Sequence, residues 1–212
     1  MQYAEFKNTF RDAPFIRSQD VVAISADRQA LRNQLNRWQH KELVIKLKKG
    51  VYILNEGDRK INPSRQFIAN QLYGPSYVSL EYALNSYGLI PERVADVTSV
   101  TTRKTLRLVN PLGNFIYQHI QPAAFRGFSS VKDSAGFVFF IAEAEKAVAD
   151  FLYLNLAQFK KDYPAALLDA YRFQNFEKLN VKRLMELAQL FNNRKLLKVT
   201  AAFCKLIKKE RK

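Results

Sequence analysis

The sequence is poor in the residues that build metal sites and covalent cross-links. Its 212 residues include one cysteine, Cys204, and two histidines. One cysteine excludes an internal disulfide and a thiolate metal cluster, and neither His40 nor His119 has a partner at ligand spacing. The seven glycines form no glycine-rich phosphate loop. We therefore expect no metal ion and no cofactor.

Long hydrophobic runs are also missing. The longest apolar stretch, around Phe137 to Ala142, is far too short to cross a bilayer. The first residues lack the charged-then-apolar pattern of a signal peptide. These features argue against a membrane role and favour a cytoplasmic protein.

Acidic residues are scarce relative to basic ones. The chain has 34 Lys and Arg against 19 Asp and Glu, a formal charge of +15. Residues 1–60 hold 12 basic and 7 acidic residues (+5), residues 61–180 hold 12 and 10 (+2), and residues 181–212 hold 10 and 2 (+8). This excess at the two ends points to a polyanionic partner, although solubility alone accounts for part of such a charge.

The stretch from Ser25 to Leu54 predicts a helix followed by a small basic hairpin. Leu31, Leu35 and Trp38 recur at helical spacing, which places them on one buried stripe. The remaining face and its flanks are rich in hydrogen-bond donors: Arg28, Gln29, Arg32, Asn33, Asn36, Arg37 and His40. Arg pairs with guanine, and Asn or Gln pairs with adenine, so this face suits DNA bases and phosphates.

A second helix precedes this one and a hairpin follows it. Ser18 is expected to cap a short helix that meets the polar-faced helix at a tight turn near residues 25–27. Residues 43–54 alternate apolar and basic side chains around a turn at Lys49-Gly50. This order predicts a winged helix-turn-helix, with the second helix in the major groove and Lys46, Lys48 and Lys49 near the backbone. The alternative is a solvated helix face beside an edge hairpin that lysines protect from aggregation.

Residues 61–212 predict a second domain, after a turn at Asn62-Pro63. Ser64 and Ser79 are each expected to cap a short helix. Three strand-like segments between residues 94 and 120 indicate an antiparallel sheet, and Phe137 to Ile141 predicts a short buried strand. Together with several helices, this makes an α+β protein with domains at residues 1–60 and 61–212.

The last helix, about Arg194 to Lys209, has one apolar side that includes Cys204, which we expect to be a core residue. Its other side is basic: Lys195, Lys198, Lys205, Lys208 and Lys209. These lysines form either a plain solvated face or a secondary polyanion contact.

One acidic cluster, Glu143-Ala-Glu-Lys146 with Asp150, invites comparison with magnesium-dependent nucleases. The spacing does not match, because Ala144 stands where the metal carboxylate should be. We interpret these side chains as ordinary surface pairs of a helix and predict no catalytic residues.

Five stretches resemble the AbiE antitoxin family, the DNA-binding half of bacterial abortive-infection toxin–antitoxin pairs. They are Lys49-Gly-Val-Tyr-Ile-Leu54, residues 77–89, residues 97–104, Phe115-Ile-Tyr-Gln-His-Ile120 and residues 142–153. Together they cover most of residues 15–156. The segment after residue 160 carries no matching motif.

The resemblance implies an antitoxin of a phage-defence operon. Its winged helix-turn-helix would repress its own operon at an operator in double-stranded DNA, expected to be an inverted repeat. Its C-terminal domain would neutralise a nucleotidyltransferase-like toxin, with or without direct contact. Two alternatives stay open: a stand-alone transcription regulator with a ligand-sensing C-terminal domain, and an RNA-binding adaptor.

Overall fold

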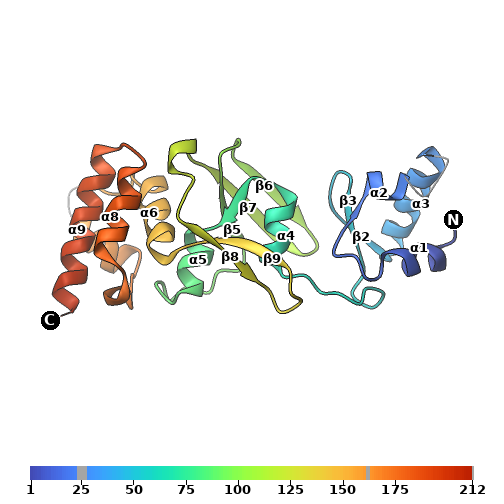
Figure 1. The fold of residues 1–212 in the computed structure, drawn as a ribbon, viewed down its shortest axis with the longest axis horizontal. Helices are drawn as coiled ribbons and strands as arrows, with labels where there is room; N and C mark the ends of the chain where they lie inside the picture. Colours follow the sequence, from blue (N-terminus) through green and yellow to red (C-terminus); the bar gives the residue numbers. More distant parts are fainter. Residues whose placement is uncertain (23–27, 161–162, 212) are drawn as a thin grey trace.

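Helices and short strands alternate along the chain, and the strands form two separate sheets (Figure 1). The computed structural model describes residues 1–22, 28–160 and 163–211. The helices are α1 (Tyr3–Phe10), α2 (Ser18–Val22), α3 (Arg28–His40), α4 (Arg65–Leu72), α5 (Leu80–Ser86), α6 (Ala144–Leu154), α7 (Tyr163–Ala165), α8 (Val181–Gln189) and α9 (Arg194–Glu210). The strands are β1 (Ile16–Arg17), β2 (Val44–Lys48), β3 (Val51–Leu54), β4 (Ser76–Val78), β5 (Val97–Thr101), β6 (Leu106–Asn110), β7 (Gly113–His119), β8 (Phe128–Lys132) and β9 (Val138–Ala142). Short helical turns lie at η1 (Pro122–Ala124), η2 (Ala166–Ala170) and η3 (Phe176–Lys178). The mixed α+β class expected from the sequence is confirmed.

The N-terminal unit combines α1, α2 and α3 with a three-stranded antiparallel sheet of order β1-β3-β2. Trp38 of α3 packs on Phe6 of α1, with ring centroids 4.7 Å apart. Tyr3 of α1 donates a hydrogen bond to Asp58, and so does Lys7. These contacts close a small core of its own for residues 1–58.

The boundary expected near residue 60 is crossed by contacts. Leu47 and Ile53 of the hairpin belong to the large core of the following residues rather than to the N-terminal one. The Asn110 side chain donates to the Leu47 carbonyl oxygen at 3.2 Å. The hairpin therefore lies between the two cores.

The central sheet has six strands in the order β6-β7-β5-β4-β9-β8. It is mixed, so the expected antiparallel sheet is wrong: β5 pairs with β7 in parallel, and β4 pairs with β9 in parallel. The reason is that β6 and β7 form a hairpin whose second strand, not its first, lies beside β5. Strand β6 runs opposite to β5, and the hairpin turn reverses the chain again. Strand β7 therefore runs in the same direction as β5.

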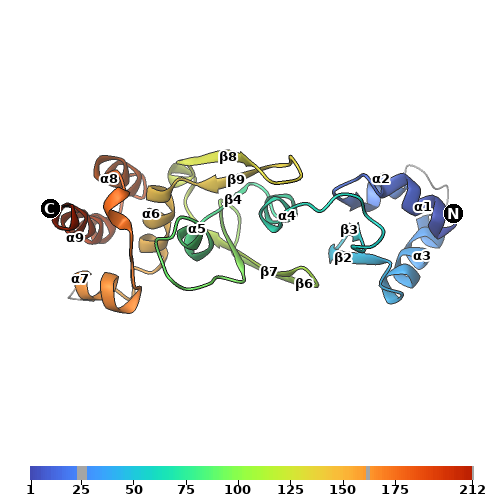
Figure 2. The ribbon, with the colours of Figure 1, turned by 90° about the horizontal axis from the view of Figure 1, so that it is seen from below.

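Helices cover both faces of this sheet (Figure 2). Tyr117 of β7 donates to the Ala69 carbonyl oxygen of α4 at 2.7 Å. Tyr77 of β4 lies on the opposite face, as its pairing with Val100 requires, and donates to Asp150 of α6 at 2.9 Å. Helix α4 therefore covers one face, while α5 and α6 cover the other.

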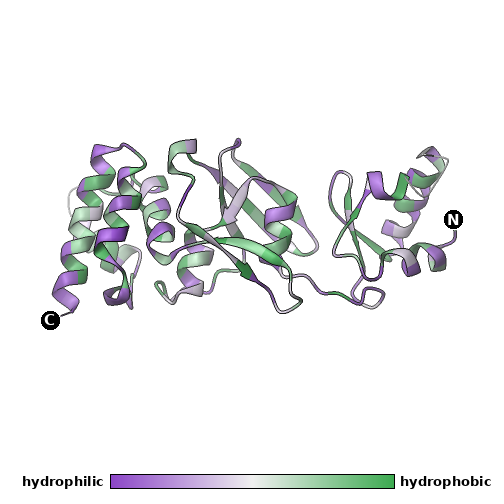
Figure 3. Ribbon diagram, viewed as in Figure 1, coloured by the Kyte–Doolittle hydropathy of each residue, from purple (hydrophilic) through white to green (hydrophobic). Residues whose placement is uncertain are grey.

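Helices α8 and α9 pack beyond α6 and end the molecule opposite to α3, as both views show. Polar and apolar residues alternate along both helices (Figure 3), and the buried ones include Leu184 and Leu187 of α8 and Phe203 and Ile207 of α9. Cys204 is buried on the inner side, which confirms it as a core residue, and burial raises the pKa of its thiol. Among the described residues, no helix has both the length and the apolar character to cross a membrane.

Several local expectations differ from the structure. Ser64 caps α4 as expected and accepts from the Phe67 amide, but the Ser79 hydroxyl donates to Asp150 instead of capping α5. Strand β9 is not fully buried, because Val138 and Phe140 on its outer face are 45% and 43% exposed. Strands β4 and β8 pair with β9 along its two edges, and this pairing leaves the exposure of its outer face unchanged.

Candidate nucleic-acid interface

Helix α3 separates an apolar stripe from a polar one. Leu31, Leu35 and Trp38 are buried at 2%, 3% and 8% exposure, as their spacing predicts. The polar residues of the candidate interface are all exposed: Gln29, Arg32, Asn33, Asn36, Arg37 and His40. Helix packing thus places the apolar stripe against α1 and the sheet and leaves the donors in solvent.

Gln29 donates to Asn33 at 3.4 Å, one turn further along the helix. The side chain of Arg28 and the expected turn at residues 25–27 lie outside the described residues.

Arg32 and Arg37 of α3 are not neutralised by any described acid. Among the described residues, neither Arg32 nor Arg37 has an ion pair or hydrogen bond. Unpaired guanidinium groups keep all their donors available for an anionic ligand.

A hollow of about 750 Å³ lies beside α3. Arg32 and Asn36 border it from the helix, Lys49 and Gly50 from the hairpin turn, and Ser18 from α2. Gly50 has a φ of +78°, and its carbonyl oxygen accepts from the Ser18 amide at 2.9 Å. The structure therefore brings one part of the polar helix face together with one of the three hairpin lysines, and no acidic side chain of the described residues borders the hollow.

The other two hairpin lysines lie elsewhere. Lys46 is exposed but borders a different hollow, together with Glu42 and Glu56. Lys48 is half-buried and donates to the Leu72 carbonyl oxygen at the end of α4. Burial lowers the pKa of Lys48, and the positive charges of Arg103 and Arg17 lower it further. Its ammonium therefore makes a contact inside the molecule that competes with any contact to a phosphate.

Arg17 and Arg103 lie close enough to Lys48 to lower its pKa, and Lys104 follows Arg103 in the chain. These residues form a basic cluster that the sequence patterns did not predict. Arg103 stacks on the Tyr73 ring, 4.7 Å from its centroid, and donates to the Gly74 carbonyl oxygen. Arg103, Lys104 and His119 line a hollow of about 670 Å³ at the end of the central sheet. The Arg103-Lys104 pair is the sequence signal that could have marked this cluster.

The lysines of α9 are distant from this region. Lys198, Lys205, Lys208 and Lys209 are exposed, as expected for the basic side of the helix. Lys195 donates to the Leu156 carbonyl oxygen at 2.5 Å. Because α9 and α3 lie at opposite ends of the molecule in both views, they do not form one continuous surface.

The acidic cluster of α6 is not a set of surface pairs, and that expectation is wrong for two of its members. Lys146 and Asp150 are both fully buried and form an ion pair at 2.6 Å. The Tyr77 and Ser79 hydroxyls donate to the second carboxylate oxygen of Asp150, at 2.9 and 2.8 Å. The Lys146 ammonium also lies 4.3 Å from the centroid of the Phe191 ring.

Burial lowers the pKa of Lys146 and raises that of Asp150, while their mutual attraction opposes both shifts. Glu143 and Glu145 are used structurally as well: Glu143 accepts two hydrogen bonds from Arg183, and Glu145 accepts from the Asn180 amide. No group of three or more metal-ligating side chains occurs within residues 1–22, 28–160 and 163–211.

Comparison with known proteins does not assign this arrangement. No protein-family model matches the chain, and no curated protein sequence is similar to it.

Proposed function

We propose that the protein is a DNA-binding antitoxin that represses its own toxin–antitoxin operon. In this proposal, residues 1–60 form a winged helix-turn-helix, α3 reads the major groove and the β2–β3 hairpin is the wing. The observation that carries it is the shared hollow bordered by Arg32, Asn36 and Lys49, which combines side chains suited to bases and to phosphates. The described residues that border it include no acid.

The dimensions of α3 support this role. Its 13 residues span about 20 Å at about 1.5 Å per residue, and the major groove, about 12 Å wide, admits an α-helix. Of the polar side chains, Arg32 and Asn36 are assigned to the bases. Lys49, at the tip of the hairpin, is assigned to a backbone phosphate.

The basic cluster at the end of the central sheet extends the proposed surface. Arg17 is the last residue of β1, and its charge acts on Lys48 together with that of Arg103. Arg103 and Lys104 are exposed and add positive potential next to the hairpin. Such residues increase affinity without base preference, because each neutralised phosphate releases condensed counterions.

The antitoxin part of the proposal rests on the resemblance to the AbiE family. A cognate nucleotidyltransferase-like toxin is the proposed protein partner, and we assign no toxin-binding residues. We also propose that the chain is not an enzyme, because the acids and the lysine that resemble a nuclease motif are engaged in structural contacts.

A footprint of the protein on the DNA upstream of its own gene tests this function. We expect protection of an inverted repeat, because one winged module covers too little duplex for high specificity and two copies would bind. Competition with single-stranded RNA separates the DNA-binding proposal from an RNA-binding adaptor, which would prefer the RNA.

The antitoxin role has its own test. Co-expression with the product of the adjacent open reading frame should relieve growth arrest caused by that product alone. A protein that binds the operator but does not relieve toxicity would be a stand-alone transcription regulator.

A further inference from the structure

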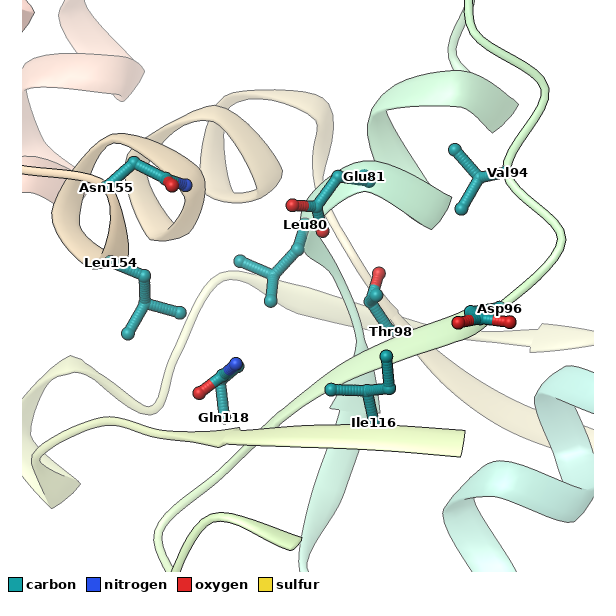
Figure 4. A pocket seen from close by; sticks show the side chains of 9 residues that line it. All are labelled: Leu80, Glu81, Val94, Asp96, Thr98, Ile116, Gln118, Leu154 and Asn155. Carbon is teal, nitrogen blue, oxygen red and sulfur yellow. The ribbon is translucent and has the colours of Figure 1, made fainter. Parts of the chain in front are cut away.

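A second hollow, of about 380 Å³, lies on the central sheet away from the basic surfaces (Figure 4). Its floor is formed by Thr98 of β5 and Ile116 of β7, and its walls by the start of α5 and the end of α6. Small-molecule sites usually measure about 300–1,000 Å³, so this hollow suits a small ligand.

The charge of this hollow is opposite to that of the protein. Glu81 and Asp96 line it, and the described residues that line it include no Lys or Arg, although the chain carries a net charge of +15. Glu81 has no hydrogen bond or ion pair within the described parts of the chain. Asp96 accepts from the Asn114 amide at 2.8 Å and forms no ion pair with a described residue. Two carboxylates without counterions attract a positively charged ligand.

Two side-chain amides add unused hydrogen-bonding capacity. Gln118 extends into the hollow from β7, and its side chain makes no hydrogen bond to a described residue. Asn155 donates to the Phe151 carbonyl oxygen at 2.9 Å, and its own side-chain oxygen faces no donor among the described residues. Thr98, by contrast, is fully engaged, since its hydroxyl donates to the Ser79 carbonyl oxygen and accepts from the Tyr82 amide.

The rest of the lining is apolar, which distinguishes an organic cation from a metal ion. Leu80, Ile116 and Leu154 present aliphatic side chains to the hollow. A hard metal ion takes about six or more oxygen ligands, whereas a ligand with an ammonium group and a carbon chain matches both the carboxylates and the aliphatic walls.

We propose that this hollow binds a small aliphatic amine in its protonated form. One ammonium group lies against Glu81 and Asp96, and the carbon chain packs on Leu80 and Ile116. The second amino group of a diamine then donates to the Gln118 side-chain oxygen at the other end of the hollow. This site is independent of the DNA-binding surface, because none of its lining residues belongs to α3, to the hairpin or to the basic cluster.

Calorimetric titration of the full chain with straight-chain diamines of two to six carbons tests the proposal. We expect 1,4-diaminobutane to bind at least as tightly as about 1 mM and the uncharged butane-1,4-diol not to bind at this level. Glu81→Gln should weaken diamine binding at least tenfold, about 1.4 kcal/mol. Glu210→Gln is the matched control, because it removes the same charge from the exposed end of α9 and should leave the affinity unchanged.

A second variant, Ile116→Trp, fills the hollow without changing its charge and should also abolish binding. Thermal unfolding checks that each variant is folded, and Asp96→Asn replaces Glu81→Gln if the latter is not. The proposal is overturned if none of the diamines binds at about 10 mM, if the diol binds equally well, or if affinity survives in Glu81→Gln. None of these outcomes alters the proposal for α3, which is tested on DNA.

Discussion

Helix α3 and helix α6 both carry basic side chains, but the two helices use them in opposite ways. Arg32 and Arg37 of α3 point into solvent without a partner, whereas Lys146 of α6 is fully buried against Asp150. The cause is the number of layers around each helix. Helix α3 has the rest of the protein on one side only, while α6 lies between the central sheet and α8 with α9.

The comparison of α3 with α6 shows which basic side chains are available to bind a ligand. A buried charge is stable only when it is paired and hydrogen-bonded, and the Lys146 ammonium accordingly donates to Asp150 and lies against the Phe191 ring. An exposed arginine loses little by remaining unpaired, and its donors stay free for another molecule. Function should therefore be sensitive to α3 and stability to α6.

The largest effect is expected from Lys146→Met. The change leaves Asp150 buried without its cation and should reduce the free energy of unfolding by about 3–5 kcal/mol. Urea unfolding measures this. The double variant Lys146→Met with Asp150→Asn should recover a large part of the loss, because the amide removes the buried charge and still accepts from Tyr77 and Ser79. An equal loss in both variants would show that packing, not charge, is responsible.

Arg32→Ala should weaken operator binding by about 1–3 kcal/mol and relax base preference, with little change in stability. Fluorescence anisotropy on the footprinted duplex and on a scrambled duplex separates the two effects. Lys198→Ala on exposed α9 is a control for loss of one positive charge. If Arg32→Ala and Asn36→Ala both retain full operator affinity, α3 is not the reading helix.

Asp58 links α1 to the loop after β3, and its contribution should depend on pH. The hydrogen bond from Lys7, followed by that from Tyr3, lowers the pKa of the Asp58 carboxyl. A lowered pKa in the folded state means that the stabilisation is present above the unfolded value, about 3.9, and is lost as the pH falls through the folded value. Asp58→Asn should cost about 1 kcal/mol at pH 7, because Lys7 is partly solvated. Unfolding measured at pH 7 and about pH 3 should show this difference shrinking in acid.

Lys49→Ala should weaken binding to all duplexes alike, by less than about 1 kcal/mol, and reduce the slope of log affinity against log salt by about one. Its neighbour provides the comparison. Lys48→Ala should leave the slope unchanged, since its ammonium already donates to the Leu72 carbonyl oxygen. A reduced slope in Lys48→Ala would mean that this internal contact opens when DNA binds.

The smallest effect on DNA is expected when Lys198, Lys205 and Lys208 are all changed to Gln. These residues lie at the opposite end of the molecule from α3, so operator affinity and its salt dependence should not change. A weaker affinity with a shallower salt dependence would identify α9 as a second phosphate contact. Loss of toxin neutralisation with normal DNA binding would assign the lysines to the toxin or its substrate.

Local patterns in the sequence predicted local structure well. The spacing of Leu31, Leu35 and Trp38 gave the buried stripe of α3, and Ser64 marked the start of α4. The sequence failed for Lys146 and Asp150, because a lysine four residues before an aspartate is the ordinary pattern of a solvated helix face. Nothing near them in the chain indicates that Tyr77 and Ser79, more than 70 residues earlier, complete the hydrogen bonds that permit burial.

The sequence by itself determined the α+β class, the two faces of α3 and the excess of positive charge, because helix periodicity, caps and composition act over a few residues or over the whole chain. The tertiary structure decided the parallel pairing of β5 with β7, the burial of the Lys146–Asp150 pair and the closeness of Arg17 and Arg103 to Lys48. Each of these depends on segments that are distant in sequence and come together only when the layers pack. Burial and charge proximity, which decide whether a polar group binds a ligand or another part of the protein, are set at that stage.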